Sequence, residues 1–309
     1  MCRMKTVTRF PLMSRMFQIN VVAAVSVVIF IMSGPGIPRT ASAQEVVSTS
    51  PDITIDLGAS VIAADEDVAV DNQLGVVVIE NLGSLPDASD VTALGLDVNG
   101  DRFISFETTT ALSGGVVARP GDVVRYDGAV YSIEFDASAA GLPDGVRTDA
   151  TSLSASGLLL SFDTTVNLGG GLVAADEDLV AWNGTSFGLL LDGSAAGIAA
   201  ALDIDSAQDV GGGQFLVSFD TSGQVGGVVF DDEDILRFDS LNFSWSLEID
   251  HSATSSSWAA ADLDAFMVPE ADSRLMLAVG MLWLVLLHPF MASRRSGARF
   301  RRINAREWT

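Results

Sequence analysis

The chain has 309 residues, of which 40 are acidic and 17 basic, and its formal net charge is −23. This excess of negative charge excludes nucleic acid as a partner, because the phosphate backbone would be repelled. Hydrophobic residues make up 48% of the chain and the single cysteine is Cys2, so we expect a packed core rather than disulfides to supply the stability.

The first 43 residues have the three parts of a secretory signal peptide. Basic residues are scattered over positions 1–18, positions 19–32 are almost wholly apolar, and Ala41 and Ala43 are the small residues of a cleavage site. We expect cleavage after Ala43, followed by a short linker over residues 44–50. The alternative is an uncleaved membrane anchor, for which this apolar stretch is short.

Residues 51–268 repeat one pattern four times. Its clearest anchor is an Asp or Asn that recurs every 56 residues, at Asp71, Asp127, Asn183 and Asp239. A constant step of this length indicates one supersecondary unit in four copies. We place the copies at residues 51–82, 90–136, 149–192 and 202–250.

Each full copy consists of four short apolar runs separated by Gly, Asp, Ser and Asn, which predicts a small antiparallel sheet with tight turns. In the third copy these runs are 150–153, 158–162, 179–182 and 186–191. A Ser-Phe-Asp/Glu-Thr sequence in the second run alternates polar and aromatic residues. We therefore expect its phenylalanines, Phe106, Phe162 and Phe219, in the core.

The first copy lacks the leading run, and that run recurs alone at residues 262–266, after the last copy. Such a strand can pair into the incomplete first sheet and close a ring. We therefore predict an all-β protein, a four-bladed β-propeller closed by its C-terminal strand. The alternative is an open array of four small sheets.

An acidic turn precedes the third run of every copy and ends at the same position. If the fold is a ring, equivalent carboxylates approach one another around its axis and need a cation between them, for which Ca²⁺ suits the oxygen ligands. The alternative is that each Asp caps its own turn through backbone amides. The residues are Asp67, Asp122, Asp178 and Asp234.

A second candidate calcium site lies between the first two runs of the second copy. Asp97, Asn99 and Asp101 place oxygen ligands at alternate positions around Gly100, as at the start of a calcium loop. A hairpin turn of the Asn-Gly type explains the same residues.

Catalytic signals are weak. His251 is the single histidine between residues 44 and 268, and we expect it to be solvated in a Ser-rich loop, which leaves little for a catalytic triad or a His-rich metal site. Trp182, Trp245 and Trp258 are candidate sugar-stacking residues, although packing explains them better. We therefore expect a protein that is not an enzyme and has no organic cofactor.

The C-terminal 41 residues, 269–309, form a second membrane-related segment. Val268, Pro269, Glu270 and Ala271 precede an apolar run over residues 275–291, which is followed by several arginines. This arrangement resembles the PEP-CTERM sorting signal of exported bacterial proteins, with Ala271 in place of the second proline. The resemblance implies processing by an exosortase-like membrane transpeptidase; the alternative is a plain membrane anchor with a cytoplasmic tail.

Charge and the repeats together favour a surface protein. Residues 44–268 contain 37 acidic residues against five arginines, a difference of −32. Segments such as 219–221 followed by 232–236 resemble repeats of bacterial surface proteins with unassigned functions. We expect a component of the cell envelope or extracellular matrix that meets acidic polysaccharide or surface proteins through bridging cations. The alternatives are a carbohydrate-binding module and a polysaccharide hydrolase.

Overall fold

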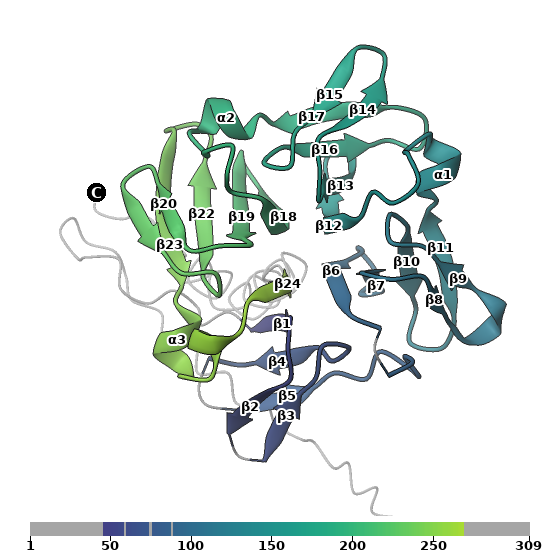
Figure 1. Cartoon of the computed structure of the whole chain (residues 1–309), viewed down its shortest axis with the longest axis vertical. Helices are drawn as coiled ribbons and strands as arrows, with labels where there is room; N and C mark the ends of the chain where they lie inside the picture. The colour runs from purple at the N-terminus through teal and green to yellow at the C-terminus, as the bar shows by residue number, and fades with distance from the viewer. Residues whose placement is uncertain (1–45, 59, 74–75, 88, 269–309) are drawn as a thin grey trace, which may run out of the picture. The chain divides into compact units, whose positions relative to one another are not determined.

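The computed structural model describes residues 46–58, 60–73, 76–87 and 89–268. They form four four-stranded antiparallel sheets arranged in a ring, the blades of a four-bladed β-propeller (Figure 1). The predicted all-β propeller is confirmed. The segments expected to act as signal peptide and sorting signal lie outside the described residues, within which no helix is long and apolar enough to span a membrane.

Each blade is built from strands in the same order, from the innermost strand outward. Blade 1 consists of β24 (Leu263–Met267), β1 (Val47–Pro51), β4 (Ala69–Asp71) and β5 (Val77–Ile79). Blade 2 consists of β6 (Val91–Leu96), β7 (Arg102–Phe106), β10 (Val123–Tyr126) and β11 (Tyr131–Phe135). Blade 3 consists of β12 (Thr148–Ser154), β13 (Gly157–Phe162), β16 (Leu179–Trp182) and β17 (Phe187–Leu191). Blade 4 consists of β18 (Ile204–Gly211), β19 (Gln214–Phe219), β22 (Ile235–Asp239) and β23 (Ser244–Ile249).

Smaller elements decorate the blades. Between its second and third strands, every blade has a two-stranded ribbon that the sequence analysis did not predict: β2 (Ile55–Gly58) with β3 (Val61–Ala63), β8 (Thr110–Ala111) with β9 (Val117–Ala118), β14 (Val166–Gly169) with β15 (Leu172–Ala174), and β20 (Gly223–Val225) with β21 (Val228–Phe230). One-turn helices follow blades 2, 3 and 4: α1 (Ala137–Ala140), α2 (Gly193–Ala196) and α3 (His251–Thr254). Two 3-10 turns complete the set, η1 (Ser113–Gly115) and η2 (Trp258–Ala260).

The C-terminal strand closes the ring. Strand β24 pairs antiparallel with β1, with Ser48 opposite Met267, so the last described strand becomes the innermost strand of the first blade. Neighbouring inner strands contact one another around the ring and are linked by hydrogen bonds to backbone groups. Thr92 donates to the Thr148 carbonyl oxygen at 3.0 Å, and the Ser206 hydroxyl accepts from the Phe266 amide at 3.1 Å.

The linker expected over residues 44–50 is wrong in its second half, because β1 begins at Val47. The strand was missed because Pro51 stands where the other blades have Phe106, Phe162 and Phe219, and because its middle is polar. Ser48, Thr49 and Ser50 are buried between β24 and β4, where Ser50 donates to the Asp67 carbonyl oxygen at 2.8 Å. A polar side chain is tolerated there because its hydrogen bond is made.

The core lies between blades as well as within them. The buried hydrophobic residues form four clusters, and each cluster combines residues of two neighbouring blades. Phe106, Phe162 and Phe219 are all at most 1% exposed, as predicted from their alternation with polar residues. The ring is therefore held together by shared apolar contacts in addition to the β24–β1 pairing.

The anchor residues at the 56-residue step begin the turn between the third and fourth strands. The Asp127 carboxylate accepts from the amides of Ala129 and Val130, both at 2.9 Å, and Asn183 accepts from the two equivalent amides. Asp and Asn recur because either side chain satisfies amides that the ladder leaves free.

Candidate metal centre

The four acidic turns are capped structures on separate blades. In every blade, the last Asp of the turn accepts a hydrogen bond from the amide three residues earlier, at 2.9 to 3.1 Å. The second oxygen of Asp122 accepts from the Ala137 amide and that of Asp178 from the Gly193 amide, which ties the turn to the start of α1 or α2. These bonds correspond to the capping interpretation. No grouping of three ligands within the described residues includes Asp67, Asp122, Asp178 or Asp234.

The loop at Asp97, Asn99 and Asp101 already has a positive partner. One Asp97 oxygen accepts from the amides of Asn99 and Asp101, and the other accepts from the Arg125 guanidinium at 2.8 Å. Arg125 also pairs with Asp101 through its Nε at 2.7 Å. The arrangement matches the hairpin alternative, in which Arg125 neutralises the carboxylates of Asp97 and Asp101.

A different cluster of carboxylates lies at one end of the inner strands. Asp205 of β18 and Asp262 and Asp264 at the start of β24 each place one oxygen within 4.8 Å of the others, and they are the single grouping of this kind among the described residues. The two strands belong to blades 4 and 1, which become neighbours only when the ring closes. Sequence reasoning missed this site, although the Asp-x-Asp pattern at 203–205 and 262–264 was a signal for it.

A β-bulge places these side chains. Each inner strand shifts register at the same point, so that one residue is left over in the pairing with the second strand. A bulge bends the strand and re-aims the extra side chain. The extra residues, blade by blade from the first, are Asp264, Thr92, Asp149 and Asp205.

Burial and mutual repulsion favour the protonated form of these carboxyl groups. Burial, and then the nearby Asp90, raise the pKa of Asp264 to about 9, while burial raises the pKa of Asp262 to about 7. Burial, followed by the charges of Asp262 and Asp264, raises the pKa of Asp205 well above its ordinary value. A carboxylate in such a site stays ionised only when a cation compensates for the lost hydration.

Blade 3 has an arginine, Arg147, at the position that Asp262 occupies in blade 1 and Asp203 in blade 4. Arg147, in blade 3, lies 3.8 Å from Asp149 and 3.5 Å from Asp163. The ion pairs within the described residues include none to Asp205, Asp262 or Asp264. The carboxylates at the boundary between blades 4 and 1 are therefore not neutralised by an arginine of the described residues.

The donor set fits a hard divalent cation. Oδ2 of Asp205 is enclosed and has no hydrogen-bond partner among the described residues, and the same is true of Oδ1 of Asp90, which adjoins Asp264. Grouped carboxylates are typical ligands for Ca²⁺, which accepts six to eight oxygens in a flexible geometry. A bound cation lowers the carboxylate pKa values and makes metal binding compete with protons.

The histidine expected in solvent is buried. His251 is 1% exposed because it begins α3 and packs against Trp258, with the ring centroids 5.2 Å apart. The expectation of a solvated side chain is wrong because the Ser-rich segment folds into α3 and η2. Trp258 and Trp245 are buried, and Trp182 packs on Phe187 with centroids 4.6 Å apart, so packing accounts for the tryptophans.

No family model and no curated protein matches the chain. Among solved structures it is similar to one described as YCF48 bound to D1 peptide, with 10% sequence identity and a TM-score of 0.30. The match covers 74% of this chain and 58% of that chain. A similarity this low implies nothing about a ligand, so the propeller assignment rests on the sheet order and the ring itself.

Proposed function

We propose that this chain is an exported, non-enzymatic β-propeller of the cell envelope or extracellular matrix that binds calcium through Asp205, Asp262 and Asp264. The observation that carries the proposal is the grouping of these three carboxylates at the β18–β24 boundary, where no arginine of the described residues pairs with them. Two of them, Asp205 and Asp264, sit on β-bulges, which are over-represented at functional positions.

The location is supported by the two ends of the sequence. The signal-peptide pattern ending at Ala43 and the PEP-CTERM-like motif at residues 268–271 both favour export, with an exosortase-like enzyme as the processing partner. Calcium is abundant outside cells, where sites of modest affinity are filled. A cation held on so acidic a domain also offers a bridge to acidic polysaccharide.

Calorimetric titration of calcium into the chelator-treated protein at pH 8 tests the proposal. We expect a saturable isotherm and a rise in melting temperature, because a ligand that prefers the folded state stabilises it by about 2.7 kcal/mol at a hundred times its Kd. Proton release is expected as well, since the cation displaces protons from the raised-pKa carboxylates.

Two asparagine variants give the test its control. Asp205→Asn removes a ligand from the cluster, whereas Asp144→Asn removes an equal charge from an exposed loop between α1 and β12. We expect the first variant to lose the calcium-induced rise and the second to keep it. A wild-type protein that shows neither heat nor a shift, or an Asp205→Asn protein that responds like wild type, rules the site out.

A further inference from the structure

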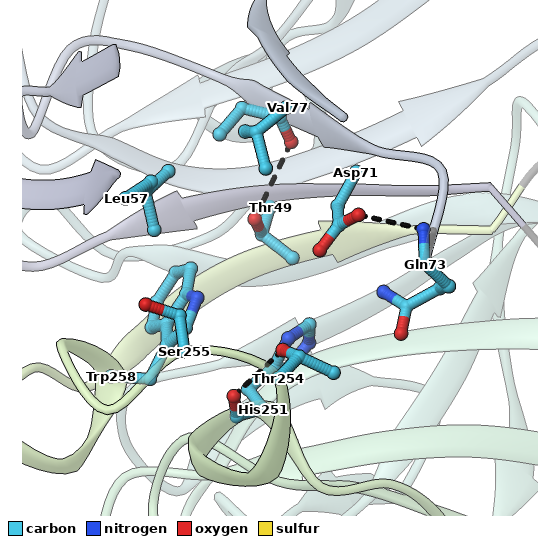
Figure 2. A pocket seen from close by; sticks show the side chains of 10 residues that line it. Thr49, Leu57, Asp71, Gln73, Val77, His251, Thr254, Ser255 and Trp258 are labelled. Carbon is cyan, nitrogen blue, oxygen red and sulfur yellow. Dashed lines mark hydrogen bonds between the residues drawn. The ribbon is translucent and has the colours of Figure 1, made fainter. Parts of the chain in front are cut away.

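A separate pocket lies where the outer part of blade 1 meets the segment that follows blade 4. Its volume is about 220 Å³, below the roughly 300 to 1,000 Å³ of drug-sized sites, so it fits a ligand of one ring. Figure 2 shows α3 residues His251 and Thr254 facing Asp71 and Gln73 across it. Ring closure creates the pocket, because its two walls are far apart in the sequence.

His251 is the feature that distinguishes this pocket from ordinary packing. The first residue of the equivalent helices in blades 2 and 3 is Ala137 or Gly193, both small. Here the imidazole is 1% exposed, and its Nε2 has no hydrogen-bond partner among the described residues. Leaving a buried polar atom unpaired costs about 1–3 kcal/mol, so a bound partner for it is a physical reason to keep histidine at this position.

The imidazole is neutral in this environment. Burial lowers the pKa of His251 to about 4, against a smaller opposing effect of Asp250. A neutral imidazole offers one donor and one acceptor nitrogen and attracts no anion. The described residues that line the pocket include no lysine or arginine and do include the Asp71 carboxylate, so the lining favours an uncharged ligand over phosphate or carboxylate.

Hydrogen-bond acceptors lie on both sides of the pocket (Figure 2). Thr49 donates its hydroxyl proton to the Ala69 carbonyl oxygen at 3.4 Å, and Thr254 donates to that of His251 at 2.8 Å, which leaves lone pairs on both hydroxyl oxygens. Asp71 adds a carboxylate. The apolar part of the lining is supplied by Leu57, Ala69 and Val77. Figure 2 shows Leu57 and Val77 on the same side of the pocket as Thr49 and Asp71.

We propose that this pocket binds one neutral sugar ring, whose hydroxyl groups donate to His251 and Asp71 while its C–H face lies against Leu57 and Val77. A ring with hydroxyl donors around its edge and an apolar C–H face matches a lining in which acceptors and apolar side chains alternate. The site is independent of the carboxylate cluster and adds to the proposed cell-surface function a direct contact with polysaccharide.

Saturation-transfer NMR with glucose, galactose, mannose and N-acetylglucosamine, followed by titration, tests this inference on the purified full chain. Methylamine and acetate are the charged comparison probes. We expect saturable binding of at least one sugar and of neither charged probe. The absence of a saturable sugar signal, or binding of methylamine alone, overturns the proposal.

Substitutions that test the pocket can be copied from the residues at equivalent positions in other blades. His251→Ala copies Ala137 of blade 2, and Asp71→Asn copies Asn183 of blade 3, which caps the same turn. Asp127→Asn makes the matching change in blade 2, away from the pocket. We expect the first two variants to bind the sugar at least tenfold more weakly and the control to bind as wild type does.

Each outcome is decisive, because Asp71→Asn retains an oxygen for the Gln73 amide and should fold even if His251→Ala does not. Circular dichroism and thermal melting check the fold of every variant. Unchanged sugar affinity in Asp71→Asn overturns the assignment. Loss of sugar binding with calcium binding intact shows that the two sites are separate.

Discussion

Asp205 and Asp264 occupy the same bulged position in neighbouring inner strands, β18 and β24, and each has a carboxylate oxygen within 4.8 Å of the other. One repeat motif thus produces a two-sided acidic site wherever two blades with Asp at this position adjoin. Blade 2 has Thr92 there, so the boundary between blades 1 and 2 lacks a second bulged carboxylate. Blades 3 and 4 also adjoin with Asp149 and Asp205 at this position, but Asp149 lies 3.8 Å from Arg147, and within the described residues the grouping of three carboxylates occurs at the boundary that β24 completes.

Stability without a divalent cation should fall as pH rises from 7 to 9. Burial raises the pKa of Asp203 to about 8, and the pKa values of Asp262 and Asp264 are about 7 and 9, all far above the unfolded values near 3.8. The folded state therefore holds more protons than the unfolded state in this window, and the stability they contribute is lost as pH passes through the folded pKa values.

Melting temperatures measured in chelator at pH 7, 8 and 9 check this prediction. His251 does not interfere, since its lowered pKa of about 4 affects stability only below the unfolded value near 6.5. Saturating calcium should reduce the slope, because the cation takes over the role of the protons. A melting temperature that is constant or rises over this range contradicts the account of the cluster.

Asp205→Asn should stabilise the metal-free protein at pH 8 while it weakens calcium binding. The amide has nearly the shape of the protonated carboxyl group and removes a charge that lies beside Asp262 and Asp264. Denaturant unfolding in chelator measures the first effect. A variant that is less stable than wild type without metal shows that Asp205 has a structural role as an ionised group.

Asp122→Ala should destabilise the protein equally with and without calcium. Asp122 is buried, and its two oxygens accept from the amides of Arg119 and Ala137, both at 2.9 Å. An unpaired buried amide costs about 1–3 kcal/mol, and the Ala137 amide is buried, so a loss in that range is expected in urea unfolding. If calcium no longer raised the melting temperature of this variant, the acidic turns would have to be calcium ligands.

Gly95→Ala should destabilise the contact between blades 2 and 3. A Cβ on Gly95 in β6 would lie 2.5 Å from the Thr151 carbonyl oxygen in β12, so the inner strands must move apart. Overpacking of this kind costs about 1–3 kcal/mol. Gly188→Ala in the outer strand β17 is the control, since its Cβ meets no atom within 4 Å and should change the free energy of unfolding by less than about 1 kcal/mol.

Phe266→Ala should be among the most destabilising single changes in the molecule. Phe266 is completely buried in the closing strand β24, and removing a buried phenylalanine costs about 3–5 kcal/mol. Phe243→Ala is the matched control, because Phe243 is 72% exposed and its edge contact with Phe238 is worth at most about 1.5 kcal/mol. Similar losses in the two variants would contradict closure of the ring by β24.

Local patterning in the sequence was sufficient for the architecture. The constant step between Asp71, Asp127, Asn183 and Asp239 indicates four units, and the isolated run at 262–266 indicates how they close. Each copy can be recognised because strand alternation and turn chemistry depend on residues a few positions apart, and comparison of the copies then gives their number and the missing strand. The same rule failed for β1, where Pro51 replaces the phenylalanine that marks the other blades.

Tertiary structure alone decided where the chemistry lies. Asp205 meets Asp262 and Asp264 because closure of the ring places β18 beside β24, and the bulges that aim two of these side chains are visible only in the pairing register. His251 packs on Trp258 of the same segment, and blade 1 completes the pocket beside it. The sequence by itself determined the repeating unit and its turns. Contacts between residues that are distant in the chain determined which carboxylates become buried together and where the pocket beside His251 forms.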